Sequence, residues 1–259
     1  MANLQDVARQ IGRLSLFVAV SMLVINHTVA ADSPFVLHPS FRVETDLFEG
    51  DATTPQSQHL ILFDSGVAYD LPVGNGSVIT VFDIPRNRIV LLHKITRVRT
   101  SISSDTLIQM TAQVRTEAAA KGNAVGLGID AKVIHGQDPD SYVIEFAGNR
   151  YEATAQPVTD PAIASEFAAF TAWAARLNIA RHVGSPPFAR ITLADHLAAE
   201  ERLPRQVKLD VRRGLKSRTF RSENLVVERL SEPDRKKISD VGGMIATFAE
   251  VEFSQFPAD

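Results

Sequence analysis

Apolar and polar residues alternate over much of the first hundred positions, which is the pattern of β-strands with one buried face. In residues 40–49, for example, Phe41 and Val43 fall on one face while Arg42 and Glu44 fall on the other. Turn-forming residues separate successive segments of this kind. We therefore predict strands at residues 40–49, 58–64, 77–84, 88–93 and 97–102, with 66–70 continuing or restarting the second strand.

Beyond residue 102 the apolar positions change to helical spacing. Ser103 or Ser104 can cap the first of these helices, and Asp160-Pro161 opens the most clearly amphipathic one, with the aspartate as cap and the proline in the first turn. The last predicted helix is interrupted or kinked near Gly242-Gly243. The predicted helices begin near residues 103, 161, 191 and 232 and end near residues 121, 177, 202 and 249.

Further strands are predicted among and after the helices, and their order decides the fold class. They cover residues 142–147, 150–155, 206–212, 219–230 and 250–255, whereas residues 123–135 remain ambiguous. Strands and helices do not alternate as they would in a parallel sheet. The order predicts an α+β fold with a curved, largely antiparallel sheet, a half-barrel with helices covering one face, in a single domain over residues 32–259.

Three of the predicted strands, at residues 60–63, 78–82 and 89–92, are apolar at both parities. An antiparallel strand with one solvent-exposed face should alternate apolar and polar residues. Both faces of these three strands are therefore predicted to be buried. One interpretation is a packed core with loops or a partner on the second face. The other is a concave face that lines an apolar cavity. The candidate ligand-binding positions, chosen by strand parity, are Leu60, Leu62, Val81, Leu91 and Val98.

The first thirty-one residues have the organisation of a secretory signal peptide. Arg9 and Arg13 precede an apolar run over residues 14–25, and the small residues Ala30 and Ala31 supply a cleavage site. The run is shorter than the roughly 20 residues that span a bilayer. We expect cleavage near Ala30 or Ala31 and a periplasmic or secreted protein without a membrane span; the alternative is a leader retained as an anchor.

Composition excludes several function classes. The net charge of −3 gives no field that would attract nucleic acid, so no nucleic-acid partner is expected. The chain has no cysteine, which rules out disulfides, thiolate metal sites and a cysteine nucleophile. We therefore expect a globular protein that is stabilised by an ordinary hydrophobic core.

Motifs for catalysis or metal binding are scarce. No Gly-x-Ser-x-Gly motif or His-Glu-x-x-His motif occurs. His196 and Glu200 are four residues apart on a predicted helix, but the pair lacks the third ligand that a zinc site needs. Asp64, Asp70 and Asp83 lie near strand ends, where aspartate is a common turn residue. We expect no metal, no cofactor and no enzymatic activity.

The meander resembles the periplasmic lipoprotein carriers of the LolA type. The segments that carry the resemblance are Gly66-Val67-Ala68-Tyr69-Asp70 and Ile79-Thr80-Val81-Phe82-Asp83-Ile84-Pro85, followed by the strand at 88–92. It covers residues 40–102, and the remainder agrees in the order of strands and helices. No residue matches the arginine that governs lid opening in those carriers. The chain is also similar to exported bacterial proteins of comparable length, which imply no activity.

Two functions follow as expectations. The first is an exported protein that binds a hydrophobic small molecule, a lipid or acyl chains between the curved sheet and the helices, as a lipoprotein carrier does. The second is a non-enzymatic interaction or structural protein of the envelope, with a packed core and a protein partner. A hydrolase built from scattered acids has no local motif in its favour.

Overall fold

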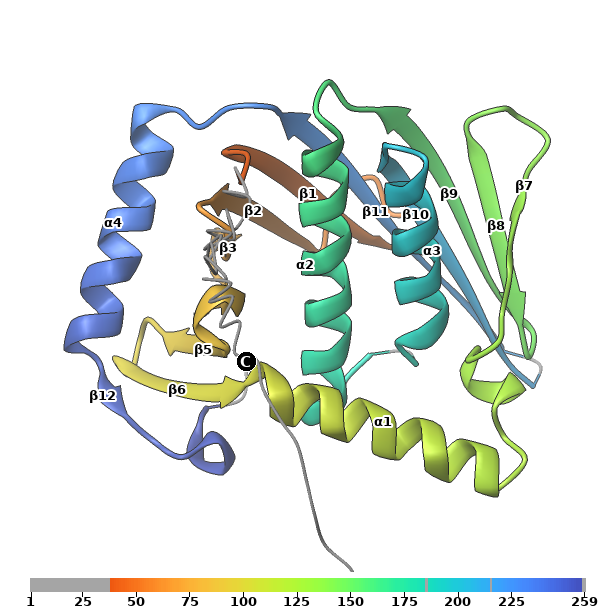
Figure 1. The fold of residues 1–259 in the computed structure, drawn as a ribbon, viewed down its shortest axis with the longest axis horizontal. Helices are drawn as coiled ribbons and strands as arrows, with labels where there is room; N and C mark the ends of the chain where they lie inside the picture. The colour runs from red at the N-terminus through yellow and green to blue at the C-terminus, as the bar shows by residue number, and fades with distance from the viewer. Residues whose placement is uncertain (1–37, 185, 215, 258–259) are drawn as a thin grey trace, which may run out of the picture. The chain divides into compact units, whose positions relative to one another are not determined.

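The computed structural model describes residues 38–184, 186–214 and 216–257, which all fall in one compact unit. Their strands form one 12-stranded sheet that does not close into a barrel (Figure 1). The sheet is curved and mostly antiparallel, and helices pack on it, so the predicted α+β class is confirmed. The predicted signal peptide and its cleavage site lie outside the described residues, as does the start of the domain near residue 32.

The first half of the chain forms an antiparallel meander, as the alternation predicts. Its strands are β1 (Phe41–Glu49), β2 (Ser57–Asp64), β3 (Val67–Val73), β4 (Val78–Asp83), β5 (Arg88–His93) and β6 (Val98–Ser103). Ser65 and Gly66 connect β2 to β3, and both have positive φ, at 54° and 74°. Two such residues suit the tight turn whose twist matches that of the flanking strands. The segment at 66–70 is therefore a separate strand.

The second half of the chain extends the sheet. Its strands are β7 (Val133–His135), β8 (Ser141–Phe146), β9 (Asn149–Pro157), β10 (Arg202–Arg213) and β11 (Lys216–Val227). β11 pairs antiparallel with β1, and this pairing joins the two halves. With β12 (Ala249–Glu250) at the other edge, the strand order is β12-β6-β5-β4-β3-β2-β1-β11-β10-β9-β8-β7.

Three helices cover one face of the sheet: α1 (Ser104–Ala120), α2 (Pro161–Ala180) and α3 (Phe188–Ala199). α2 packs on β1 to β5 in a core that includes Phe41, Phe63 and Phe167, and α3 packs on β8 to β10. The predicted caps are confirmed, because Ser103 accepts a hydrogen bond from the backbone of Thr106 and Asp160 accepts one from that of Ala162. α3 begins three residues earlier than position 191, after Pro187.

The fourth helix, α4 (Glu232–Thr247), lies against the opposite face of the sheet. Its Val241 packs with Val81, Val90 and Leu92, whose neighbours along the strands point to the α2 side. The second apolar face of β4 and β5 is therefore buried by the chain's own helix and not by loops or a partner. The predicted interruption at Gly242-Gly243 is wrong, because the helix is continuous to Thr247.

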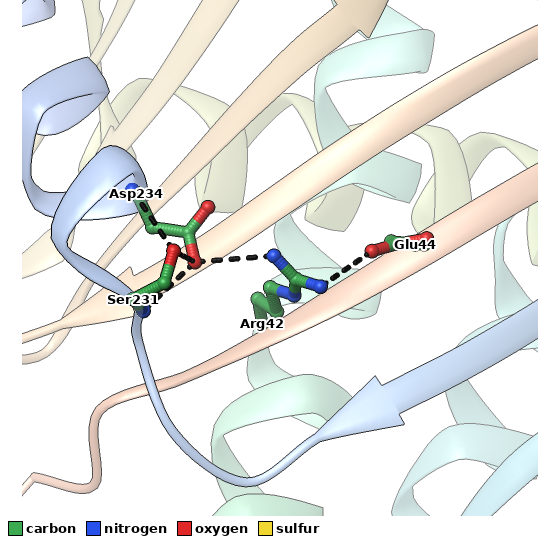
Figure 2. A network of polar contacts seen from close by, with 4 residues as sticks. All are labelled: Arg42, Glu44, Ser231 and Asp234. Carbon is green, nitrogen blue, oxygen red and sulfur yellow. Dashed lines mark hydrogen bonds and ion pairs between the residues drawn. The ribbon is translucent and has the colours of Figure 1, made fainter.

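A polar network fixes the start of α4 against β1 (Figure 2). Ser231 and Asp234 form a reciprocal capping box, in which the Ser231 N–H donates to Oδ2 of Asp234 at 2.9 Å and the Asp234 N–H donates to Oγ of Ser231 at 3.3 Å. Nη1 of Arg42 donates to the same Oδ2 at 3.3 Å, and Nη2 of Arg42 lies 2.9 Å from Oε1 of Glu44. Because the Asp234 carboxylate is only 1% exposed, these contacts replace the water that it loses.

The chain end differs from the predicted strand at 250–255. β12 contains only Ala249–Glu250 and pairs parallel with β6. A short 3-10 helix follows at Phe253–Gln255, where Phe253 and Phe256 pack against the α2-side core. Packing of these half-buried aromatic rings against the core takes the chain away from the sheet edge, which an extended strand would have followed. Within the described residues, no helix is long and apolar enough to cross a membrane.

Loss of the α2 cap should destabilise the protein measurably. Asp160 accepts the Ala162 N–H at 2.9 Å, so Asp160→Ala leaves that donor without its side-chain partner. We expect a loss of about 1 kcal/mol in the free energy of unfolding, measured by urea denaturation. Asp160→Ser, which can still cap, should restore most of it. Equal stability of Asp160→Ala and the wild type would show that this cap contributes nothing.

Candidate functional site

A cavity of about 500 Å³ lies between α2 and the sheet and is partly open to solvent. Residues of β1, β2, β10 and β11 line it from the sheet, and α2 and the start of α3 line it from the helical layer. The change of side-chain size along α2 explains why a space exists here. Phe167 fills the core beside Phe63, whereas the following turns present Ala174, Ala175 and Asn178 to the sheet. The smaller side chains leave the gap open.

The lining is mostly apolar but contains several polar groups. The apolar residues include Leu47, Phe48, Ile61, Phe167, Phe170, Ala174, Val207, Leu209 and Phe220. Four of the polar groups form two pairs: His59 Nδ1 lies 2.6 Å from Asp70 Oδ1, and Thr45 donates to Asn224 at 2.8 Å. Such a lining suits a ligand with an apolar body and a small number of polar groups.

Two arginines line the cavity: Arg221 forms an ion pair with Glu223, whereas Arg190 forms none among the described residues. Arg190 lies in the first turn of α3, and its Nη1 is buried without a hydrogen-bond partner among the described residues. Burial lowers the pKa of the Arg190 guanidinium, and Asp195 on the same helix interacts instead with Arg176. A guanidinium stays protonated at neutral pH. The carboxylate that lines the cavity, Asp70, is paired with His59, so among the described residues Arg190 keeps its positive charge without an ion-pair partner.

The start of α3 adds to the positive potential near Arg190. Pro186 and Pro187 line the cavity, and Pro187 occupies the N-cap position without a side-chain cap for the first turn. Uncapped N–H groups at a helix start carry partial positive charge. Arg190 and this helix start therefore both favour an anion at the same end of the cavity.

A second cavity of about 420 Å³ lies nearer the start of α2. Ala68, Phe82 and Trp173 contribute to its walls, and Phe170 lines both this cavity and the first one. The phenyl ring of Phe170 packs edge-on against Phe63 and Phe82. This side chain therefore separates two spaces under the same helix.

The five candidate residues chosen from the sequence lie on both faces of the sheet. Leu60, Leu62 and Val81 share the parity of the α4 side, where Leu62 pairs with Tyr69 and Tyr69 with Val81. Leu91 packs in the α2-side core, and Val98 pairs with His93 on that same side. None of the five lines the 500 Å³ cavity. The five residues therefore do not line a common cavity. Because β4 and β5 are buried on both sides, the alternation along these strands does not show which face borders a cavity.

Sequence reasoning missed Arg190 and a third neighbour of His196 and Glu200. The signal for Arg190 was a single charge among apolar residues at the start of a helix, in Phe188-Ala189-Arg190-Ile191. The third neighbour is His135 on β7, whose ring the fold brings beside His196. It comes from the segment 123–135, which had no clear sequence pattern.

Comparison with known proteins leaves the geometry as the basis for function. No protein-family model matches the chain, and no curated protein matches it.

Proposed function

We propose that this protein binds an amphipathic organic anion, a lipid or other acyl-chain acid, and that it does so without catalysing a reaction. The apolar part of the ligand would occupy the 500 Å³ cavity, and its acidic group would pair with Arg190. The unpartnered Nη1 of Arg190 is the observation that carries the proposal. The role of lipoprotein carrier and the periplasmic location remain proposals that rest on the resemblance and on residues 1–31.

The buried guanidinium of Arg190 carries a free-energy cost when it has no partner. A buried charge without a partner is costly, and a hydrogen bond to a charged group recovers about 1.5–3 kcal/mol. A ligand carboxylate or phosphate accepts such bonds in a bidentate geometry that matches arginine. Arg190 therefore supports an anionic ligand more strongly than a neutral hydrocarbon.

The size and lining of the cavity support the apolar part of the ligand. Its 500 Å³ falls within the roughly 300–1,000 Å³ of small-molecule sites. Each buried methylene contributes about 0.8 kcal/mol of transfer free energy, so a chain of several carbons can bind even though the cavity is partly open. Leu47, Val207 and Phe220 supply the contacts on the sheet side.

The first experiment extracts the purified full-length protein with organic solvent and analyses the extract by mass spectrometry. A near-stoichiometric lipid or acyl-chain acid would support the proposal and identify the ligand class. A clean extract, together with failure to bind the fatty-acid probe below, would favour the envelope interaction protein, which a pull-down from envelope extract would then test.

A matched pair of probes tests the role of Arg190. Parinaric acid is a fluorescent fatty acid, and its methyl ester has the same chain without the charge. We expect the wild type to bind the acid about 10–100-fold more tightly than the ester, the equivalent of about 1.5–3 kcal/mol. Arg190→Gln should remove this preference while leaving ester binding within about threefold.

The control for that experiment is Arg229→Gln, which removes an exposed arginine after β11. It should keep the preference for the acid. A preference that persists in Arg190→Gln contradicts the assignment of Arg190, and absence of binding to both probes contradicts the cavity proposal itself. Thermal melting of each variant shows whether the fold is retained.

A further inference from the structure

His135, His196 and Glu200 come together at the far end of α3 from Arg190. His135 ends β7, His196 lies in the last turn of α3, and Glu200 follows as its C-cap (Figure 1). Their ligand atoms all lie within 4.8 Å of one another. Two elements far apart in the sequence therefore converge on one surface site.

The two imidazoles approach the same carboxylate oxygen. Oε1 of Glu200 lies 3.2 Å from Nε2 of His196 and 3.6 Å from Nε2 of His135. In a tetrahedral zinc site, bonds of about 2.0–2.2 Å place neighbouring ligand atoms about 3.3–3.6 Å apart. The two measured distances lie close to this range.

The hydrogen bonds around the site leave these atoms available. Nε2 of His196 is buried and makes no hydrogen bond, so its contact with Glu200 has the distance of an ion pair without hydrogen-bond alignment. Tyr142 donates to Oε2, the other oxygen of Glu200, at 2.6 Å.

Tyr142 therefore has the place of an outer partner that orients a metal-ligating carboxylate. It is fully buried under α3, which fixes its hydroxyl group and hence the rotation of the Glu200 carboxylate. Arg202 also lies near Glu200, but its guanidinium forms an ion pair with Asp140. The local balance of charge is thus compatible with a bound cation.

We propose that His135, His196 and Glu200 bind a divalent transition-metal ion of the zinc class, with water completing the coordination. Two neutral imidazoles and one carboxylate are a donor set that zinc accepts, and three protein ligands leave one position open. The ion would connect the β7–β8 hairpin to α3. This site is separate from the cavity and does not depend on ligand binding there.

Isothermal titration of the untagged, EDTA-treated full-length protein with ZnCl₂ tests the proposal. We expect one site whose affinity falls by about 100-fold or more in His135→Ala, beyond the 10–100-fold typical of losing an outer partner. Tyr142→Phe should weaken binding by about 10–100-fold. His135 is exposed, so its replacement should leave the fold intact.

The matched control is His182→Asn, which removes an exposed histidine from a positive-φ position that asparagine tolerates. It should change the affinity less than about twofold, and Co²⁺ should give the intense visible absorption of a tetrahedral complex in the wild type but not in His135→Ala. Absence of zinc binding, or equal affinity in His135→Ala and His182→Asn, would overturn the site.

Discussion

Leu91→Ala and Leu92→Ala should each destabilise the protein by about 2–5 kcal/mol. The two residues are adjacent on β5 and point to opposite faces, yet they are only 1% and 0% exposed. Leu91 packs in the core beneath α2, and Leu92 packs with Val241 beneath α4. If one face of the strand were exposed to solvent, only one of two adjacent substitutions would cause a large loss of stability. Similar losses at both positions would therefore show that both faces are buried.

Urea denaturation gives both free energies of unfolding. Val73→Ala is the control, because Val73 is 53% exposed at the end of β3 and should change the stability by less than about 0.5 kcal/mol. A loss below about 1 kcal/mol for Leu92→Ala, with a large loss for Leu91→Ala, would mean that α4 does not seal its face in solution.

Asp234→Ala should cost about 2–4 kcal/mol at neutral pH, since it removes both the capping box of α4 and the buried partner of Arg42. The side chain of Arg42 is 28% exposed and keeps Glu44, which is why the expected loss is below the upper limit for a broken buried pair. Glu44→Ala is the matched control: Glu44 is 45% exposed, and its loss should cost less than about 1 kcal/mol.

The effect of Asp234 should depend on pH in one direction. Burial by itself would raise the pKa of the carboxyl, but the hydrogen bonds from Ser231 and the charge of Arg42 outweigh burial and hold the pKa below 3.8. A carboxyl with a depressed pKa in the folded state contributes stability above its unfolded pKa and loses it as the pH falls through the folded value.

The difference in stability between the wild type and Asp234→Ala should therefore be full at pH 6–7 and shrink below about pH 4. Denaturation curves of both proteins over this range measure it. A difference that grows as the pH falls would contradict the assigned direction of the pKa shift.

The elements themselves could be predicted from local patterns. The alternation in residues 40–49 and the spacing after Asp160-Pro161 correspond to β1 and α2, because period and capping are properties of neighbouring residues. The failures occurred where contacts distant in sequence decided the outcome. Gly242-Gly243 stays helical because Val241, Met244 and Ile245 pack on the sheet. The residues after Glu250 leave the sheet because Phe253 and Phe256 pack against the core.

In the two proposed sites, too, some features follow from the local sequence and others depend on contacts distant in sequence. His196 and Glu200 are one helical turn apart, so their proximity follows from the sequence, whereas His135 joins them only because β7 lies beside α3. Arg190 stands out in the sequence as a charge among apolar residues. The fold leaves its Nη1 without a hydrogen-bond partner among the described residues, and Asp195 interacts with Arg176 instead.

By itself, the sequence determined the α+β class, the antiparallel meander and the burial of both faces of its central strands, because these depend on periodicity along the chain. Only the tertiary structure decided that α4 covers the second face, that the cavity lies under Ala174 and Ala175, and that β11 pairs with β1. Those features depend on contacts between segments separated by 100 residues or more, and local pattern carries no information about such distances.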